Sequence, residues 1–268
     1  MTMAMIHKTA VVDAKAEIGA GVTIGPFAYI ESDVRIGDGC VIGPHASILR
    51  YTSIGNNCEI HAGAVLGDVP QDTSFRNVES YVKIGSKCII REGVTIHRGT
   101  KEGTSTEIGD GCFLMAFSHC GHNVELGRGV IMANGVLLAG YVKVGDRAFI
   151  SGNVVVHQFV KIGRLAMLGG NCGISKDIPP FCTTVPVALN TIVGLNVVGM
   201  RRAGLTVEDR KQVKQAFNIL YRSGMNVTDA AIKLKETFKS GPALEFYSFI
   251  ESSERGICGG TSSSVDED

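Results

Sequence analysis

The 268-residue chain contains no tryptophan, and aromatic residues make up only 6% of it. It also has no excess of either charge, because 26 Lys and Arg residues balance 26 Asp and Glu residues. Phosphate backbones are bound by proteins with a basic surplus, so nucleic acid is not expected as a partner. The scarcity of aromatics, together with 34 glycines and many Val and Ile residues, favours short strands joined by tight turns.

Long apolar segments are missing as well. No run approaches the ~20 apolar residues that span a bilayer, and residues 1–8 lack an apolar core followed by a cleavage site. We therefore expect no membrane insertion and a cytoplasmic location. The eight cysteines include no CxxC pair, so zinc-ribbon spacing is absent, and we expect neither a metal nor another cofactor.

The sequence contains instead a six-residue repeat. Every sixth residue from Ile6 to Ile174 is Ile, Val, Leu or Met, except at Asp72, Glu102 and Cys120. Glycine often follows the aliphatic residue, where it would relieve the backbone at a corner, and a small or β-branched residue comes four positions after it. A period of six matches neither a helix nor an alternating strand. It predicts a solenoid in which each hexad supplies one short strand and one turn.

This pattern resembles the hexapeptide-repeat family, whose fold is a left-handed parallel β-helix with triangular coils of three hexads. We expect this all-β fold over residues 1–185. The left hand is implied by the resemblance alone, because parallel crossovers are usually right-handed. Five cysteines occupy the small inward position, where a thiol is an apolar filler; they are Cys40, Cys58, Cys88, Cys112 and Cys172.

Two polar segments interrupt the hexads. The first covers residues 68–82, and the aliphatic phase resumes at Ile84, so the break spans whole hexads and predicts an external loop. The second, residues 100–106, is shorter and again contains glycine.

The repeat stops after Pro179–Pro180, since proline cannot donate to a strand ladder. We expect a C-terminal helical domain over residues 186–258 and a disordered, Ser-rich and acidic tail over residues 259–268. Helices in this domain are expected to start at Thr206, Thr228 and Pro242.

Two histidines that point outward form the candidate active site. His119 and His122 lie outside both inward phases, and the register stacks His122 with Gly140 and Gln158 in successive coils. A histidine beside an unshielded glycine N–H supplies a general base and an oxyanion donor. The arrangement points to acyl transfer, while the alternative of ordinary solvated histidines stays open.

Several longer stretches are more specific than the hexads. They are Arg91–Thr100 (REGVTIHRGT), His119-x-x-His122, Val156–Phe159 (VHQF), Asp177–Pro180 (DIPP) and the Gly/Asn/Arg pattern of Gly194–Gly204. Together they resemble the bacterial UDP-N-acetylglucosamine O-acyltransferases that start lipid A synthesis. The resemblance runs from Ile6 to about Gly256.

The resemblance implies transfer of an (R)-3-hydroxyacyl group from acyl carrier protein to the 3-hydroxyl of UDP-N-acetylglucosamine, by a homotrimer with active sites between subunits. It implies that His122 is the general base, that Gly140 donates to the oxyanion, and that Gly170 admits a long acyl chain. The loop carboxylate of Asp72 would come from the next subunit. The substrate-binding positions it implies are Asp72, His119, Tyr141, His157, Gln158, Asn196 and Arg202.

Four residues depart from the family pattern. Asn123 stands where an Asp is common, Tyr141 replaces a His, Ser74 replaces a loop Lys, and Val198 replaces an acidic residue. An Asn cannot stabilise an imidazolium by charge. The departures leave a 3-amino sugar nucleotide open as the acceptor and a catalytically degenerate scaffold open as an alternative. In the register, Asn123 and Tyr141 share a column with Phe159.

Two other enzymes would share this fold. A zinc-dependent γ-type carbonic anhydrase needs three histidine ligands, and the His119-x-x-His122 spacing does not suit it. The N-acyltransferase of the same pathway carries an extra N-terminal uridine-binding domain, whereas the hexads here begin at Ile6.

Overall fold

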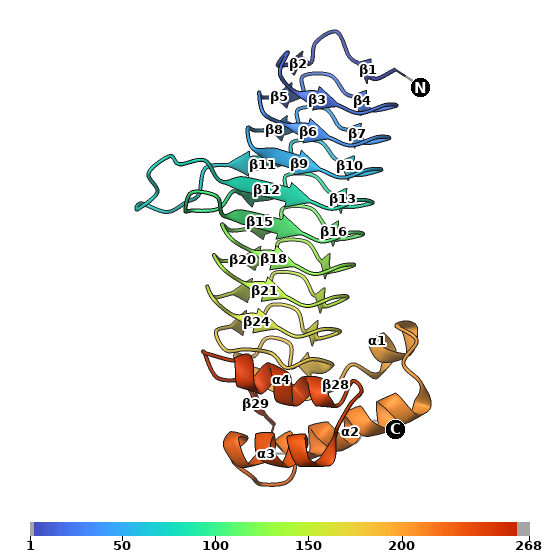
Figure 1. Ribbon diagram of the computed structural model, residues 1–268, viewed down its shortest axis with the longest axis vertical. Coiled ribbons are helices and arrows are strands. Elements are labelled where there is room, and N and C mark those ends of the chain that lie inside the picture. Colours follow the sequence, from blue (N-terminus) through green and yellow to red (C-terminus); the bar gives the residue numbers. More distant parts are fainter. Residues whose placement is uncertain (1–2, 262–268) are drawn as a thin grey trace.

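The computed structural model describes residues 3–261 and shows a long β-helix followed by a helical domain (Figure 1). Short strands recur along the chain, and the coils contribute strands to three sheets whose strands are parallel, except that β27 and β28 pair antiparallel. The predicted solenoid of one short strand and one turn per hexad is therefore confirmed. Within residues 3–261, no helix has the length and apolar content needed to cross a membrane.

The three sheets are named here A, B and C. Sheet A contains β1 (Met5–Ile6), β4 (Thr23–Ile24), β7 (Val41–Ile42), β10 (Glu59–Ile60), β13 (Ile89–Ile90), β16 (Phe113–Leu114), β19 (Ile131–Met132), β22 (Phe149–Ile150), β25 (Met167–Leu168), β27 (Cys182–Thr184), β28 (Thr191–Leu195) and β29 (Gly259–Gly260). Sheet B contains β2 (Val11–Val12), β5 (Tyr29–Ile30), β8 (Ser47–Ile48), β11 (Val65–Asp68), β14 (Thr95–His97), β17 (His119–Cys120), β20 (Leu137–Leu138), β23 (Val155–Val156) and β26 (Gly173–Ile174). Sheet C contains β3 (Glu17–Ile18), β6 (Arg35–Ile36), β9 (Thr52–Ile54), β12 (Tyr81–Ile84), β15 (Ser105–Ile108), β18 (Glu125–Leu126), β21 (Lys143–Val144) and β24 (Lys161–Ile162).

Residues at equivalent positions in successive coils are 18 apart in the sequence, which we call the coil offset; Ala20 N–H, for example, donates to Asp38. Across the first break the offset grows to 30 residues, between Asn56 and Ser86. Across the second it is 24 residues, between Thr95 and His119. Both values equal one coil plus whole hexads, so the insertions leave the inward phase intact. The first insertion projects from the side of the solenoid between β11 and β12 (Figure 1), slightly shorter than the predicted loop 68–82.

The interior is filled by the two inward phases of the repeat. Residues such as Ile30, Ile90 and Leu138 are fully buried, and each contributes about 1.5–3 kcal/mol through removal of its side chain from water. All eight cysteines are buried and free, as predicted for the five in the small phase. Cys120, which replaces an aliphatic residue, is likewise buried as filler.

At one corner of the solenoid, the glycine that follows the aliphatic residue is required for a reason other than the predicted relief of the backbone. Gly37 does not adopt a positive φ. The left-handed conformation falls two residues later, at Gly39 (φ 69°), and in the next coil at Asn57 (φ 56°), two residues after Gly55. A Cβ on Gly37 would lie 2.4 Å from Asn56 Oδ1, and that oxygen accepts from Asp38 N–H at 2.9 Å. Glycine is needed there because the next coil places a capping side chain against it.

The helical domain follows the last coil and covers the end of the solenoid (Figure 1). Its helices are α1 (Val197–Arg202), α2 (Val207–Tyr221), α3 (Val227–Thr237) and α4 (Leu244–Ser252). Helix α2 starts where predicted, with Thr206 as its N-cap in a capping box with Asp209. Helix α1 was not predicted, and α3 is capped by Asn226, slightly before the predicted start.

The predicted disordered tail begins too early. Gly259–Gly260 form β29, which pairs with β28. Residues 262–268 of that predicted tail lie outside the described residues.

The helical domain is fixed to the coils by Arg164, whose guanidinium donates to both Glu245 oxygens at 3.0 and 2.7 Å and lies 4.8 Å from the Phe181 ring centroid.

The corner geometry predicts that Gly85→Ala destabilises the protein by about 1–3 kcal/mol, because its Cβ would force apart two tightly packed coils. That Cβ would lie 2.4 Å from Asp110 Oδ1 and 2.7 Å from Asp110 N. Thermal unfolding followed by circular dichroism measures the effect. Gly194→Ala is the control, since a Cβ there meets nothing within 4 Å; equal melting temperatures for both variants would contradict the packing explanation.

Candidate active site

His122 lies in the turn between β17 of sheet B and β18 of sheet C. The turns of successive coils are joined by hydrogen bonds from Tyr141 N–H to His122 O and from Phe159 N–H to Gly140 O, both 3.0 Å. The predicted column of His122, Gly140 and Gln158 is therefore present.

Gly140 provides the space that His122 occupies. A Cβ on Gly140 would lie 2.3 Å from His122 Cε1 and 2.5 Å from Nε2, so any larger residue would displace the imidazole. Within residues 3–261, the Gly140 N–H donates no hydrogen bond. Gly140 is buried, and the imidazole packs against it. A ring nitrogen therefore lies close to a glycine whose N–H has no partner among the described residues, and acyl transfer requires a base and a hydrogen-bond donor of this kind.

Asn123 contacts the other ring nitrogen of His122. The distance from His122 Nδ1 to Asn123 Oδ1 is 3.1 Å, and the same oxygen is 3.1 Å from Thr100 N and 3.0 Å from Thr100 Oγ1. Tyr141 OH lies 2.9 Å from Thr100 Oγ1, so its hydroxyl is occupied within the chain. The Tyr141 ring stacks on Phe159 at 5.0 Å and meets His122 edge-on at 5.2 Å. The predicted column of Asn123, Tyr141 and Phe159 is thus present beside His122.

The ring of His119 pairs with that of His97, a residue that the sequence pattern did not single out. His119 Nδ1 lies 2.7 Å from Thr95 Oγ1, and its ring meets that of buried His97 at 4.8 Å. Burial and, less strongly, the His97 charge lower the pKa of His119 to about 4. Burial also lowers the pKa of His97. His97 lies in the REGVTIHRGT stretch, at the end of β14. Its position is outside the two inward phases of the repeat, so the repeat alone did not identify it as buried.

Asp72 lies in the external loop, where its Oδ1 accepts from Ser74 N–H and Ser74 Oγ, both at 2.8 Å. These hydrogen bonds lower the pKa of Asp72, and the charges of His122 and Arg76 contribute to the shift. The resemblance assigns Asp72 to a site of the next subunit, and this assignment stays a prediction. Ser74, in place of the family Lys, holds the carboxylate.

His157 and Gln158 lie at the edge of an open cavity of about 460 Å³ over sheet B, lined also by Val155, Gly173 and Leu189. Leu137 and Val155 are 43% and 53% exposed, and they follow His119 in register along the outer face of the sheet. Leu137 and Val155 thus form an exposed apolar strip along sheet B that starts at His119, called the apolar track below.

Gly170 borders the opposite edge of sheet B, in the turn between β25 and β26. A Cβ there would meet Gly152 O at 3.5 Å, an ordinary contact, so the turn leaves space. Gly170 and His122 are therefore at different corners of the triangular coil.

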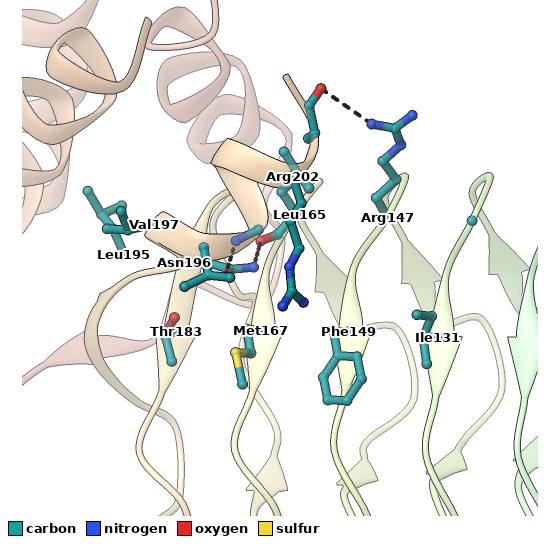
Figure 2. A pocket seen from close by; sticks show the side chains of 14 residues that line it. Ile131, Arg147, Phe149, Leu165, Met167, Thr183, Leu195, Asn196, Val197 and Arg202 are labelled. Carbon is teal, nitrogen blue, oxygen red and sulfur yellow. Dashed lines mark hydrogen bonds between the residues drawn. The ribbon is translucent and has the colours of Figure 1, made fainter. Parts of the chain in front are cut away.

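Asn196 and Arg202 line a larger cavity of about 730 Å³, between α1 and the outer face of sheet A. Figure 2 shows Ile131, Phe149 and Met167 forming its apolar wall. Arg147 and Arg202 are the charged residues among its lining, and none of the lining residues carries a carboxylate. The cavity suits an anion with an apolar body, and it lies away from His122, which is at the B–C corner.

The Asn196 side chain is already engaged. Its Oδ1 accepts from Gly199 N–H at 2.8 Å as the cap of α1, and its Nδ2 donates to Leu165 O at 2.9 Å. Asn196 thus fixes α1, and through it Arg202, over the cavity (Figure 2). Within residues 3–261, no group of three or more His, Cys, Asp and Glu side chains is arranged to hold a metal ion.

Comparisons with known proteins agree with this architecture. Residues 177–258 match the family model described as UDP N-acetylglucosamine O-acyltransferase, domain 2. The model for six repeats of the bacterial transferase hexapeptide matches residues 15–50, 33–68 and 105–140.

Relatives match over nearly the whole chain. The acyl-(acyl-carrier-protein)–UDP-N-acetylglucosamine O-acyltransferase of Thermodesulfovibrio yellowstonii is 42% identical over 94% of this chain and 98% of its own length. That of Anaeromyxobacter dehalogenans is 39% identical over the same shares.

Solved structures give the same result. The UDP-N-acetylglucosamine acyltransferase of Bacteroides fragilis is 40% identical, covers 94% of this chain and 99% of its own, and has a TM-score of 0.89. The enzyme of Campylobacter jejuni is 37% identical over 95% and 99%, with a TM-score of 0.88.

The fold and these matches define an acyltransferase of the hexapeptide-repeat class, built on a left-handed parallel β-helix. The chain belongs to the UDP-N-acetylglucosamine O-acyltransferase family.

The burial of His119 predicts that its imidazole stays neutral until the pH falls to about 4, well below the ordinary value of 6.5. The unfolded chain takes up this proton at higher pH, so stability is lost as pH falls from 6.5 towards 4. An NMR titration of the His119 ring measures the midpoint. The His119→Gln variant should lose this part of the acid sensitivity, and a midpoint near 6.5 in the folded protein would rule the explanation out.

Proposed function

We propose that the protein transfers an (R)-3-hydroxyacyl group from acyl carrier protein to the 3-hydroxyl of UDP-N-acetylglucosamine, the first step of lipid A biosynthesis. The observation that carries the proposal is the packing of the His122 imidazole against Gly140, whose backbone N–H has no hydrogen-bond partner within residues 3–261. This is the pairing of base and oxyanion donor that acyl transfer to a hydroxyl needs.

The reaction follows from this geometry. His122 Nε2 takes the proton of the acceptor hydroxyl as its oxygen attacks the thioester carbonyl. The carbonyl oxygen becomes an oxyanion and accepts from the Gly140 N–H. When the C–S bond breaks, the imidazolium returns the proton to the thiolate of the carrier, so the base is restored.

The cavity beside α1 supports a nucleotide diphosphate as part of the acceptor. Its apolar wall suits a base, and Arg202 is the charge that would face a diphosphate, since arginine pairs with phosphate oxygens in a bidentate manner. Arg147, at the rim, donates to Ala203 O. The absence of carboxylates from the cavity lining favours an anion further.

The separation of this cavity from His122 supports a homotrimer with active sites between subunits. Within one chain, the cavity lies over sheet A and His122 at the corner of sheets B and C. One substrate can contact both only if the cavity of one subunit faces His122 of another. The same reasoning applies to Gly170, which is separated from His122 by the width of sheet B.

The apolar track on sheet B supports a long acyl chain. It runs from His119 over Leu137 and Val155 towards Gly173. Because Gly173 adds no bulk at the far end, the track accommodates an extended chain lying along the solenoid.

A 3-amino sugar nucleotide is the second candidate acceptor, favoured by Asn123. An amide next to His122 adds no negative charge, so the imidazolium that forms during deprotonation lacks a charged partner there. An amine attacks a thioester with less help from a base than a hydroxyl, so the amino acceptor would depend less on His122.

The first prediction from the mechanism concerns the base. His122→Gln should lower transfer to UDP-N-acetylglucosamine by about 10²–10⁴-fold, the usual contribution of a general base. Purified protein is assayed with UDP-N-acetylglucosamine and its 3-amino analogue, using hydroxyacyl donors of several lengths. His45→Gln is the control, because exposed His45 packs against Phe27 far from the site. Wild-type protein without transfer to either acceptor would indicate a degenerate scaffold.

The second prediction concerns the oxyanion donor. Gly140→Ala should lower kcat by about 10²–10³-fold with a smaller effect on KM, because the methyl group displaces the imidazole from the donor N–H. Gly152→Ala is the matched control, since its Cβ would meet its nearest atom, Asn134 O, at 3.5 Å. Similar kcat values for the two variants would argue against the assigned role of Gly140.

A further inference from the structure

The amide of Asn123 is held with its oxygen towards His122. Thr100 N–H can only donate a hydrogen bond, and it lies 3.1 Å from the amide atom that faces His122. That atom must therefore be the oxygen and not the NH₂ group. The backbone of Thr100 thus fixes which end of the amide meets the imidazole.

The orientation of the amide selects the tautomer of His122. The Asn123 oxygen accepts only, and His122 Nδ1 lies 3.1 Å from it, so Nδ1 carries the proton. Nε2 then keeps its lone pair beside Gly140, where a base is required. Without this contact, a neutral imidazole is free to adopt the other tautomer, in which Nε2 is protonated and cannot act as a base.

Two hydroxyls extend the contact in a directional chain. Thr100 Oγ1 donates to Asn123 Oδ1 at 3.0 Å, which leaves it as the acceptor for Tyr141 OH at 2.9 Å. Thr100 is supplied by the second insertion, whose turn is closed by bonds between Lys101 and Thr104. Tyr141 is fixed by stacking on Phe159, with an interplanar angle of 14°.

We propose that Thr100 and Tyr141 are positioning residues that orient Asn123 and thereby hold His122 as the Nδ1–H tautomer. The role of this chain in catalysis rests on the proposed function of His122 as the base. An uncharged amide, locked by the insertion, replaces a carboxylate as the group that orients the base.

The charges around His122 determine how a carboxylate at position 123 would act. Asp72 of the external loop interacts with His122 electrostatically. His97 and His119, from β14 and β17, are both buried enough for their pKa values to be lowered, so they remain neutral near pH 7. Tyr141 contributes a neutral hydroxyl. Asn123→Asp would place a negative charge beside the ring and favour its protonated form.

The experiment measures the tautomer directly, by ¹⁵N chemical shifts of His122 in protein labelled at histidine. Wild type should show protonated Nδ1 and unprotonated Nε2. Asn123→Ala should populate the Nε2–H tautomer and lower kcat about 100-fold, with KM near the wild-type value. Thr100→Val keeps the backbone N–H but loses the hydroxyl, so about a tenfold loss of kcat and a partial tautomer shift are expected.

Two conservative variants should restore the geometry. Thr100→Ser retains the hydroxyl and should return kcat and the tautomer to wild-type values. Asn123→Asp should keep the Nδ1–H tautomer and move the acidic limb of the kcat/KM profile to higher pH, because the carboxylate favours the imidazolium. Tyr141→Phe should give a smaller loss than Thr100→Val. Thr23→Val, on β4 far from the site, controls for loss of one threonine hydroxyl.

An unchanged His122 tautomer in both Asn123→Ala and Thr100→Val would overturn the proposal, whatever their activities. Loss of kcat in Thr100→Ser as large as in Thr100→Val would also overturn it, because a hydroxyl would then not be the required group. A wild-type protein that shows the Nδ1–H tautomer but no transferase activity would refute the proposed function and still support this hydrogen-bond chain.

Discussion

The register of one coil on the next is the constraint on which the rest of the structure depends. Backbone N–H groups donate to carbonyls in the neighbouring coil, and the offset is 18 residues or 18 plus whole hexads. A shift by one residue would turn every inward side chain outward, so the buried aliphatic phase fixes the register. Once it is fixed, residues far apart in sequence form straight columns, and His122 necessarily lies under Gly140.

This constraint explains which parts of the site the sequence could predict. The columns through His122 and Asn123 follow from arithmetic on the repeat, and both are present in the structure. The two insertions do not follow from it, because their residues have no partner at the coil spacing. Thr100 is such a residue, and so its contact with Asn123 was invisible in the sequence. His97 was missed because it lies at the end of β14, outside the inward phases, although its ring meets that of His119 edge-on.

Other differences arise where one residue type has two physical uses. The corner glycine at position 37 was expected to relieve backbone strain, but the structure shows that it makes room for Asn56. Asn196 was expected to bind the substrate, which stays a prediction, and the structure adds that its amide caps α1. In both cases the residue type was informative and the particular contact was not, because a capping oxygen and a substrate-binding oxygen look alike in a sequence. The fold class, which depends on many repeats at once, is much less sensitive to such ambiguity.

The β-helix fixes the position of His122, and other segments contact its ring, so the surroundings of the base can change during evolution while its position is kept. The β-helix supplies fixed columns, so changing the acceptor does not require moving His122. The residues that contact its Nδ1 side come from a turn and an insertion, and either can change while the coils stay in register. Replacing a carboxylate by Asn123 removes a charge but keeps an acceptor at the same place, provided that Thr100 prevents the amide from turning over. Orientation and charge are then supplied by different groups, and a proton acceptor can retain its tautomer while its basicity is adjusted.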